Sequence, residues 1–255
     1  MYLRCKTIFA GRSLARRSIC KMRGVLLLLI FTGWSDLSSG QVIIALLFGD
    51  KLNTDKLEFG LTVTPALTNI TNNDSKWKTG LNLGVYLNYR PDRRFSLRVE
   101  GIAKGSLGAG SIKPYPTGND SLDALLRSGS VERRISAFGL PVLCRYRIGG
   151  NFFAEAGIQA DLFLKVKDVF KADVGGNPLE YTITTSDEYT KLDLALAGSL
   201  FYKPRKDKKS IGFGLRYVHG VTDISKTAAG TQENYMWQLN ITIPVGAGKN
   251  AAAAP

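Results

Sequence analysis

The sequence has few of the residues that carry redox or metal chemistry, with three cysteines and one histidine in 255 residues. Cys5 and Cys20 lie in the first 40 residues, which we expect to be removed, so Cys144 is the only cysteine of the predicted mature chain. One cysteine cannot form an internal disulfide, and His219 has no cysteine or histidine partners for a zinc site. We therefore expect no metal site and no cofactor.

The chain also lacks an apolar run long enough to cross a membrane as a helix. The run from Gly24 to Trp34 (GVLLLLIFTGW) has eleven residues, which is too short for a bilayer span but suits the apolar region of a signal peptide. Seven basic residues precede it, and Ser38-Ser39-Gly40 supplies small residues for cleavage before Gln41. A membrane anchor is the alternative interpretation, and Met22 is an alternative translation start.

The basic charge of the chain belongs partly to this leader. Removing residues 1–40 removes seven of the 34 Lys and Arg residues and one of the 21 Asp and Glu residues, which leaves a net charge of +7 instead of +13. No predicted helix carries a stripe of Lys and Arg, so we expect no nucleic-acid partner.

Eight segments of the remaining chain alternate apolar with polar or small residues. The clearest is Leu192–Tyr202 (LDLALAGSLFY), and a period of two indicates a β-strand with one apolar and one polar face. The segments lie at 57–64, 81–89, 95–100, 137–146, 152–164, 192–202, 211–217 and 235–243. Strands of this kind behind a secretory signal are typical of a transmembrane β-barrel, whose apolar face contacts lipid.

The connections between these strands alternate in length. Short turns are expected at Pro91-Asp92 and Gly149-Gly150-Asn151, and long loops at about 105–131 and 166–188. Outer-membrane barrels have short periplasmic turns and long outer loops. The sequence therefore predicts an all-β, eight-stranded, antiparallel up-and-down transmembrane β-barrel, integral to the bacterial outer membrane.

The predicted organisation has four parts. Residues 1–40 form the basic lead and signal peptide, 41–56 an N-terminal segment at the barrel foot, 57–246 the barrel, and 247–255 a disordered, low-complexity tail.

An eight-stranded barrel has an interior that side chains can fill. The charged residues predicted to face inward are Arg98, Lys104, Arg145, Arg147 and Arg216, balanced by Glu58, Glu100, Glu155, Asp161 and Asp193. Unpaired charge in a narrow lumen is costly, so these residues are expected to form ion pairs.

Spacing suggests two groupings of these charges. Arg145 and Glu155 are expected to face each other across the hairpin centred on residue 150. Asp161, Asp193 and Arg216 lie on neighbouring strands and are predicted to form a second cluster. The alternative is that the charges line an ion path.

Several segments resemble the PorT-like outer-membrane β-barrel proteins of Bacteroidota. They are VIIALLFGDKLNTDKLEF at 42–59, ISAFGLPVLCRYRI at 135–148, FFAEAGIQADLFL at 152–164 and LRYVHGVTDI at 215–224. The resemblance covers most of the mature chain and implies an integral outer-membrane barrel, in a family whose namesake is tied to type IX secretion. It carries no catalytic motif onto this sequence.

The expected function is non-enzymatic: an envelope-structural, surface-interaction or secretion-associated barrel with a filled lumen. The alternatives are a narrow channel and a lipid-modifying enzyme, for which His219, Asp223 and Ser225 are the candidate catalytic residues. The basic run Lys203–Lys209 (KPRKDKK) is either a contact for anionic partners or a solvated turn. Expected partners are outer-membrane lipid and envelope or secretion-system proteins, and the oligomeric state stays open.

Overall fold

The computed structural model describes residues 54, 56–205 and 210–245. The predicted signal peptide, most of the predicted segment 41–56 and the predicted tail lie outside the described residues. The strands are β1 (Leu57–Ile70), β2 (Lys78–Tyr89), β3 (Phe95–Ile112), β4 (Ser130–Gly149), β5 (Phe152–Val174), β6 (Asn177–Thr184), β7 (Leu192–Tyr202), β8 (Gly212–Gly220) and β9 (Asn234–Pro244). The connections hold a short helix, α3 (Asp120–Leu126), and a 3-10 turn, η1 (Ser186–Glu188). In the described ranges, no helix has the length and hydropathy needed to cross a membrane.

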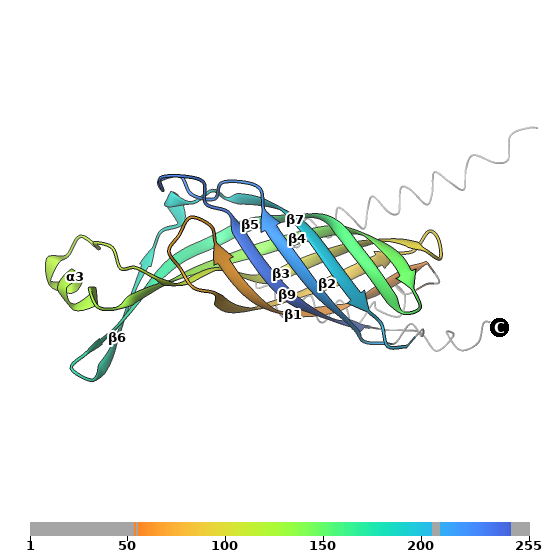
Figure 1. Cartoon of the computed structure of the whole chain (residues 1–255), viewed down its shortest axis with the longest axis horizontal. Helices are drawn as coiled ribbons and strands as arrows, with labels where there is room; N and C mark the ends of the chain where they lie inside the picture. Colours follow the sequence, from red (N-terminus) through yellow and green to blue (C-terminus); the bar gives the residue numbers. More distant parts are fainter. Residues whose placement is uncertain (1–53, 55, 206–209, 246–255) are drawn as a thin grey trace, which may run out of the picture. The chain divides into compact units, whose positions relative to one another are not determined.

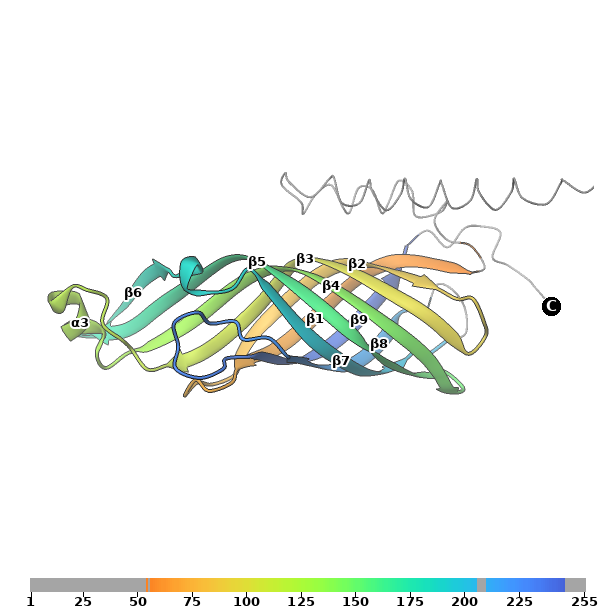
Figure 2. The same ribbon diagram turned by 90° about the horizontal axis from the view of Figure 1, so that it is seen from above.

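Eight of these strands form a closed antiparallel ring. The order of all nine strands in the sheet is β4-β3-β2-β1-β9-β8-β7-β5-β6, and an additional pairing of β4 with β5 closes the ring and leaves β6 outside it. Figures 1 and 2 show the strands tilted together, with β6 and α3 projecting beyond one end. The predicted eight-stranded up-and-down barrel is confirmed, whereas the ninth strand, β6, was not predicted.

Side chains alternate between the outside of the ring and its lumen. In β7, Leu196 and Leu200 are 58% and 64% exposed, whereas Ala197 and Phe201 are buried. The same alternation runs through the other ring strands, and the outward residues are mainly Leu, Ile, Val and aromatic. The period-two pattern of the sequence therefore corresponds to an apolar outer face and a lumen face of mixed polarity.

Aromatic side chains pack in pairs on the outside near both ends of the barrel. The pairs are Phe95–Tyr146 and Phe152–Tyr202 at the end with the short turns, and Tyr217–Trp237 and Trp77–Tyr235 toward the other end, with ring centroids 4.7–5.0 Å apart. Such belts mark the two membrane interfaces. Because outer-membrane barrels turn tightly on the periplasmic side, we assign the end with the β2–β3 and β4–β5 turns to the periplasm.

The segment predicted as a loop at 166–188 is largely β-structure, and strands also enter both ends of the one predicted at 105–131, which corrects the prediction. β3 continues to Ile112, β4 begins at Ser130, and β5 continues to Val174 and pairs with β6. The lipid-facing positions become polar at Ser136 and Lys165, so these extensions lie beyond the membrane. We call residues 107–135 and 165–190 the outer platform.

An apolar core, continuous with that of the barrel's outer half, supports the outer platform. Leu126 of α3, Val131 of β4 and Phe170 of β5 are buried in one apolar cluster with Tyr115 and Leu179 packed against it. This core was not predicted from the sequence, because glycines and lysines interrupt the alternation of apolar and polar residues in these segments.

A buried ion pair ties the platform segments together, and we call it the outer clamp. Asp168 of β5 accepts hydrogen bonds from Arg133 of β4 at 2.9 and 2.6 Å and from the Tyr115 hydroxyl at 2.7 Å. The Arg133 guanidinium lies 5.0 Å from the Tyr189 ring centroid. Burial, together with the hydrogen bond to Asp168, raises the pKa of Tyr115 above its ordinary value. Burial also raises the pKa of Tyr189 to about 12, against the opposing charge of Arg133.

A bulge in β3 moves one predicted lumen charge to the outside. The register between β2 and β3 shifts so that Leu83 pairs with Lys104 and Gly84 pairs with Ile102. Since an extra residue inverts the inside–outside alternation that follows it, Lys104 is exposed beside the outward Leu83. The prediction that Lys104 faces the lumen was wrong.

Replacing Asp168 with asparagine is expected to loosen the platform while the barrel stays folded. The change leaves Arg133 buried without its anion, and breaking a buried ion pair costs about 3–5 kcal/mol. Amides of residues 166–171 should then exchange with solvent about 100-fold faster or more, whereas β7 and β8 amides keep their rates. The exposed Asp187→Asn is the control, and equal exchange in both variants would contradict the role of the clamp.

Candidate functional site

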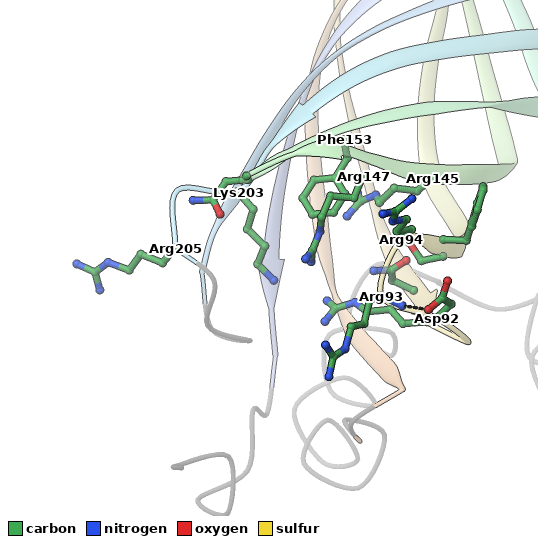
Figure 3. Close-up of a pocket in the computed structure, with 14 residues that line it drawn as sticks. Asp92, Arg93, Arg94, Arg145, Arg147, Phe153, Lys203 and Arg205 are labelled. Atoms are coloured by element: carbon green, nitrogen blue, oxygen red, sulfur yellow. Dashed lines mark hydrogen bonds between the residues drawn. The ribbon is translucent and has the colours of Figure 1, made fainter. Parts of the chain in front are cut away.

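At the periplasmic end the lumen opens into a hollow. Its empty volume is about 520 Å³, including the part that is open to solvent. Its basic lining residues are Arg90, Arg93, Arg94, Arg145, Arg147, Lys203 and Arg205, and its acidic lining residue is Asp92. We call this group the basic mouth (Figure 3). It gathers positive charge from the β2–β3 turn, the end of the β4–β5 hairpin and the segment after β7.

Sequence reasoning missed the basic mouth. It treated Pro91-Asp92 only as a tight turn and placed Arg147 in the lumen, where it was expected to join an ion pair. Arg147 is instead exposed at the rim, which corrects that prediction. The sequence signal for the basic mouth was the turn RPDRR at 90–94. This turn faces the end of the β4–β5 hairpin, which also carries arginine.

Glu58 of β1 neutralises part of this charge just inside the mouth. Its carboxylate contacts Arg90 and accepts hydrogen bonds from Lys203 Nζ at 3.0 Å and from the Tyr86 hydroxyl at 3.0 Å. Glu58 is buried and faces inward.

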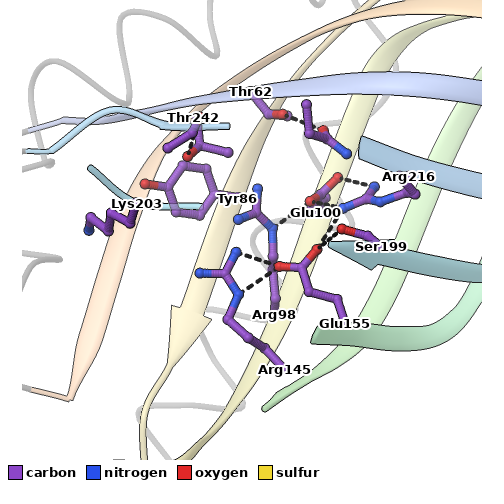
Figure 4. Close-up of polar contacts among 12 residues, drawn as sticks. Thr62, Tyr86, Arg98, Glu100, Arg145, Glu155, Ser199, Lys203, Arg216 and Thr242 are labelled. Atoms are coloured by element: carbon purple, nitrogen blue, oxygen red, sulfur yellow. Dashed lines mark hydrogen bonds and ion pairs between the residues drawn. The ribbon is translucent and has the colours of Figure 1, made fainter. Parts of the chain in front are cut away.

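Deeper in the lumen, five charged side chains from four strands meet, and we call them the lumen network. They are Arg98 and Glu100 of β3, Arg145 of β4, Glu155 of β5 and Arg216 of β8, each no more than 3% exposed. Figure 4 shows them pointing toward one another across the barrel.

Glu100 lies between two arginines. Arg216 donates two hydrogen bonds to its carboxylate, at 2.9 and 2.7 Å, and Arg98 Nε donates a third. This fork geometry suits a guanidinium and a carboxylate. Because β3 and β8 are not neighbours in the ring, the two hydrogen bonds from Arg216 to Glu100 cross the lumen.

Glu155 extends the network to β4 and β7, the two neighbours of its own strand β5 in the ring. It accepts a hydrogen bond from Arg145 Nε at 2.6 Å and another from the Ser199 hydroxyl at 2.9 Å. Arg216 also lies 3.6 Å from Glu155.

Aromatic rings cover the faces of the buried guanidinium groups. Arg98 lies 4.4 Å from the Tyr86 ring centroid, and Arg145 lies 4.1 Å from that of Phe201. Such contacts stabilise a cation that has lost its water. Phe201 fits because β8 has glycine opposite it: a Cβ at Gly212 or Gly214 would lie 2.3 or 2.6 Å from the ring.

Of the ten charges predicted to face the lumen, the structure brings five together in the lumen network and separates Asp161 and Asp193 from them. Arg145 and Glu155 are register partners across the β4–β5 hairpin, and Arg98, Glu100 and Arg216 join them. Asp161 and Asp193 are register partners of each other and make no ion pair within the described part of the chain. Gln159 donates to Asp161 at 2.8 Å, while Thr222 and Asn234 donate to Asp193 at 2.7 and 2.8 Å.

The predicted grouping of Arg216 with Asp161 and Asp193 was therefore wrong. Arg216 pairs in register with Ser199, six positions along β7 from Asp193 and toward the periplasm. Its side chain meets the glutamates of the lumen network instead.

Apolar side chains occupy inward positions in the outer half of the barrel. Leu107, Ile135, Phe163, Val218 and Met236 are buried there and belong to the cluster that continues into the outer platform. The lumen thus has the ion-paired network toward the periplasm and, toward the outside, a layer in which this apolar cluster predominates but which also holds the buried Asp161 and Asp193.

The residues considered for catalysis do not converge. His219 Nδ1 lies 3.1 Å from the Tyr217 hydroxyl and its Nε2 lies 3.4 Å from Glu233. One Asp223 oxygen accepts the backbone N–H of Ser225 at 3.1 Å, as a loop residue does. Across residues 54, 56–205 and 210–245, no three His, Cys, Asp or Glu side chains form a metal-ligand group.

The fold and this interior can be compared with known proteins. The family model described as outer membrane protein beta-barrel domain matches residues 50–226. The chain belongs to this outer-membrane β-barrel family. It is therefore an integral outer-membrane protein, in agreement with its closed ring and apolar outer face. No match was found among the curated proteins.

Solved structures of small outer-membrane proteins are similar to the chain at low identity. Ail, the attachment invasion locus protein of Yersinia pestis, has 11% identity and a TM-score of 0.40, over 75% of this chain and 99% of its own. The outer membrane protein OprG from Pseudomonas aeruginosa has 12% identity and a TM-score of 0.35, over 74% of this chain and 91% of its own. The Neisserial surface protein NspA has 11% identity and a TM-score of 0.36, over 73% and 96%.

Replacing Glu100 with glutamine is expected to destabilise this family member strongly. The glutamine leaves Arg98 and Arg216 buried without their shared anion, and the free energy of unfolding should fall by about 3–5 kcal/mol. Urea titration of the protein folded in lipid vesicles measures the change.

Glu180→Gln is the matched control for that substitution. Glu180 is exposed on β6 and lies 3.8 Å from Lys171, so its loss should cost at most about 0.5 kcal/mol. Equal effects of the two substitutions would show that the lumen network does not stabilise the barrel.

Proposed function

We propose that the protein is a non-enzymatic outer-membrane barrel with a filled lumen, whose role is to hold the outer platform at the cell surface for interaction with envelope or surface molecules. The observation that carries the proposal is the two-layered interior. A charged layer bonded across the barrel lies below an apolar layer that continues into the platform.

The dimensions of the barrel favour this function over that of a channel. Eight strands leave an interior that side chains fill, whereas diffusion porins use sixteen or more. The buried arginines and glutamates form bonds to one another rather than lining a hydrated bore. An ion path would require these bonds to break.

The platform has features suited to an interaction surface. It shares the apolar core of the barrel's outer half and has a buried clamp, so it presents fixed side chains. Leu125 of α3 and Tyr181 of β6 are 45% and 39% exposed there. β6 pairs on one side with β5 and ends the strand order of the sheet.

The resemblance to PorT-like proteins supports one version of this proposal, in which the partner is a secretion-associated envelope protein. A lipid-modifying enzyme has less support, because His219 faces Tyr217 and Glu233 rather than a nucleophile.

Purified protein in planar bilayers is expected to show no steady conductance. The variant with Glu100→Ala and Arg216→Ala removes one charge of each sign and should also stay silent, because the apolar layer remains. Heat-modifiable gel mobility verifies that each sample is folded. Steady single-channel steps from the folded wild type would overturn the filled-lumen proposal in favour of the channel.

Photo-crosslinking in intact envelopes is expected to capture a partner from the platform. A benzoylphenylalanine in place of Tyr181 should give a discrete cross-linked protein, which mass spectrometry then identifies. The control places the same probe at Tyr146, which is similarly exposed, at 38%, but faces lipid at the periplasmic belt. No protein adduct from Tyr181, or the same adduct from both positions, would contradict the surface-interaction role.

A further inference from the structure

Four arginines of the basic mouth, Arg93, Arg94, Arg147 and Arg205, have no acidic partner among the described residues. Arg90 and Lys203 contact Glu58, and Arg145 contacts Glu155. For these four arginines, by contrast, the described part of the chain provides no side-chain ion pair. The Asp92 carboxylate accepts the backbone N–H of Arg93 rather than a guanidinium.

The backbone holds these arginines around the same hollow. The Arg147 N–H donates to the Arg94 carbonyl at 2.9 Å, which ties the β4–β5 hairpin to the β2–β3 turn. The Arg147 guanidinium lies 5.2 Å from the Phe153 ring centroid, inside the mouth. Figure 3 shows Arg93, Arg94 and Arg147 gathered at the opening, with Arg145 deeper in the barrel.

The mouth also has a buried polar wall. Arg145 and Lys203 line the hollow and are 3% and 8% exposed. The site therefore differs from a solvated charged turn, because a ligand would meet fixed donors at depth as well as flexible donors at the rim.

The hollow lies at the same height along the barrel as the periplasmic membrane surface. Phe95 lines the hollow, yet it is 48% exposed on the outer face, where it packs against Tyr146 in the periplasmic aromatic belt. Aromatic belts lie at the level of the lipid headgroups. The hollow thus lies at the level of this belt, where phosphate groups of the periplasmic leaflet are expected.

We propose that the basic mouth binds a phosphate group, presented by an anionic phospholipid of the periplasmic leaflet or as free phosphate. A phosphate carries up to two negative charges and several acceptor oxygens, and guanidinium groups bind such oxygens in pairs. Arg93, Arg94 and Arg147 supply the unpaired charge, and Arg145 with Lys203 forms the inner wall.

The test compares the wild type with Arg93→Gln/Arg94→Gln/Arg147→Gln. Two probes separate the possible sources: native mass spectrometry after reconstitution in equal parts of phosphatidylglycerol and phosphatidylcholine, and calorimetric titration with inorganic phosphate. We expect the wild type to retain phosphatidylglycerol in preference, or to bind inorganic phosphate. The triple variant should weaken whichever binding is seen at least tenfold.

The control variant, Arg127→Gln/Lys165→Gln/Lys191→Gln, removes the same charge from exposed positions outside the periplasmic mouth and should keep wild-type binding. Heat-modifiable mobility verifies folding, and Arg93→Gln/Arg94→Gln, which keeps the Phe153 contact of Arg147, serves if the triple variant misfolds. Lipid retention supports a phospholipid ligand, and phosphate binding without lipid preference supports a free anion. No binding of either probe, or equal loss in the control, overturns the proposal.

Discussion

The pairing of β4 with β5 is the constraint on which the rest of the structure depends. It closes the sheet, and within lipid an open sheet edge would leave backbone N–H and C=O groups without partners. The pairing runs from the periplasmic turn to the outer platform, from Gly149 opposite Phe152 to Ser130 opposite Lys171. One strand pair therefore both closes the membrane ring and forms the base of the surface structure.

Closure with eight strands makes the interior narrow, and this narrowness determines how the charges behave. Burying an arginine at that depth is costly unless its guanidinium meets a carboxylate or a ring. Glu100 satisfies two arginines from opposite walls, and Phe201 lies near Arg98 and Arg145. Glycines at 212 and 214 leave space for that ring. The resulting bonds join strands that are not neighbours in the sheet.

The two ends of the barrel differ in what they present. The outer end has an apolar core, a clamp and a strand at the end of the sheet order, which suit contacts with other molecules at the surface. The periplasmic end has arginines without acidic partners in the described part of the chain, held by a backbone hydrogen bond between two turns. The lumen network and the apolar cluster lie between these two ends.

Much of this architecture was predictable from sequence because it is periodic. Alternation in segments such as Leu192–Tyr202 identifies strands, their lipid face and the inward position of residues such as Arg98 and Glu155. Short turns identify neighbours, which is why Arg145 could be placed opposite Glu155. These inferences need only the two-residue repeat and the geometry of a hairpin.

Other features arise only from closure of the ring and from local irregularity. The bulge in β3 exposes Lys104, and the stagger of β8 brings Arg216 to Glu100 rather than to Asp193. The strands of the outer platform were not predicted, because glycines and lysines interrupt the alternation of apolar and polar residues there. Sequence by itself determined where the membrane-spanning strands lie and which of their faces meets lipid, because both follow from local alternation. The tertiary structure decided which charges meet, because partners across a lumen depend on the register of every strand between them.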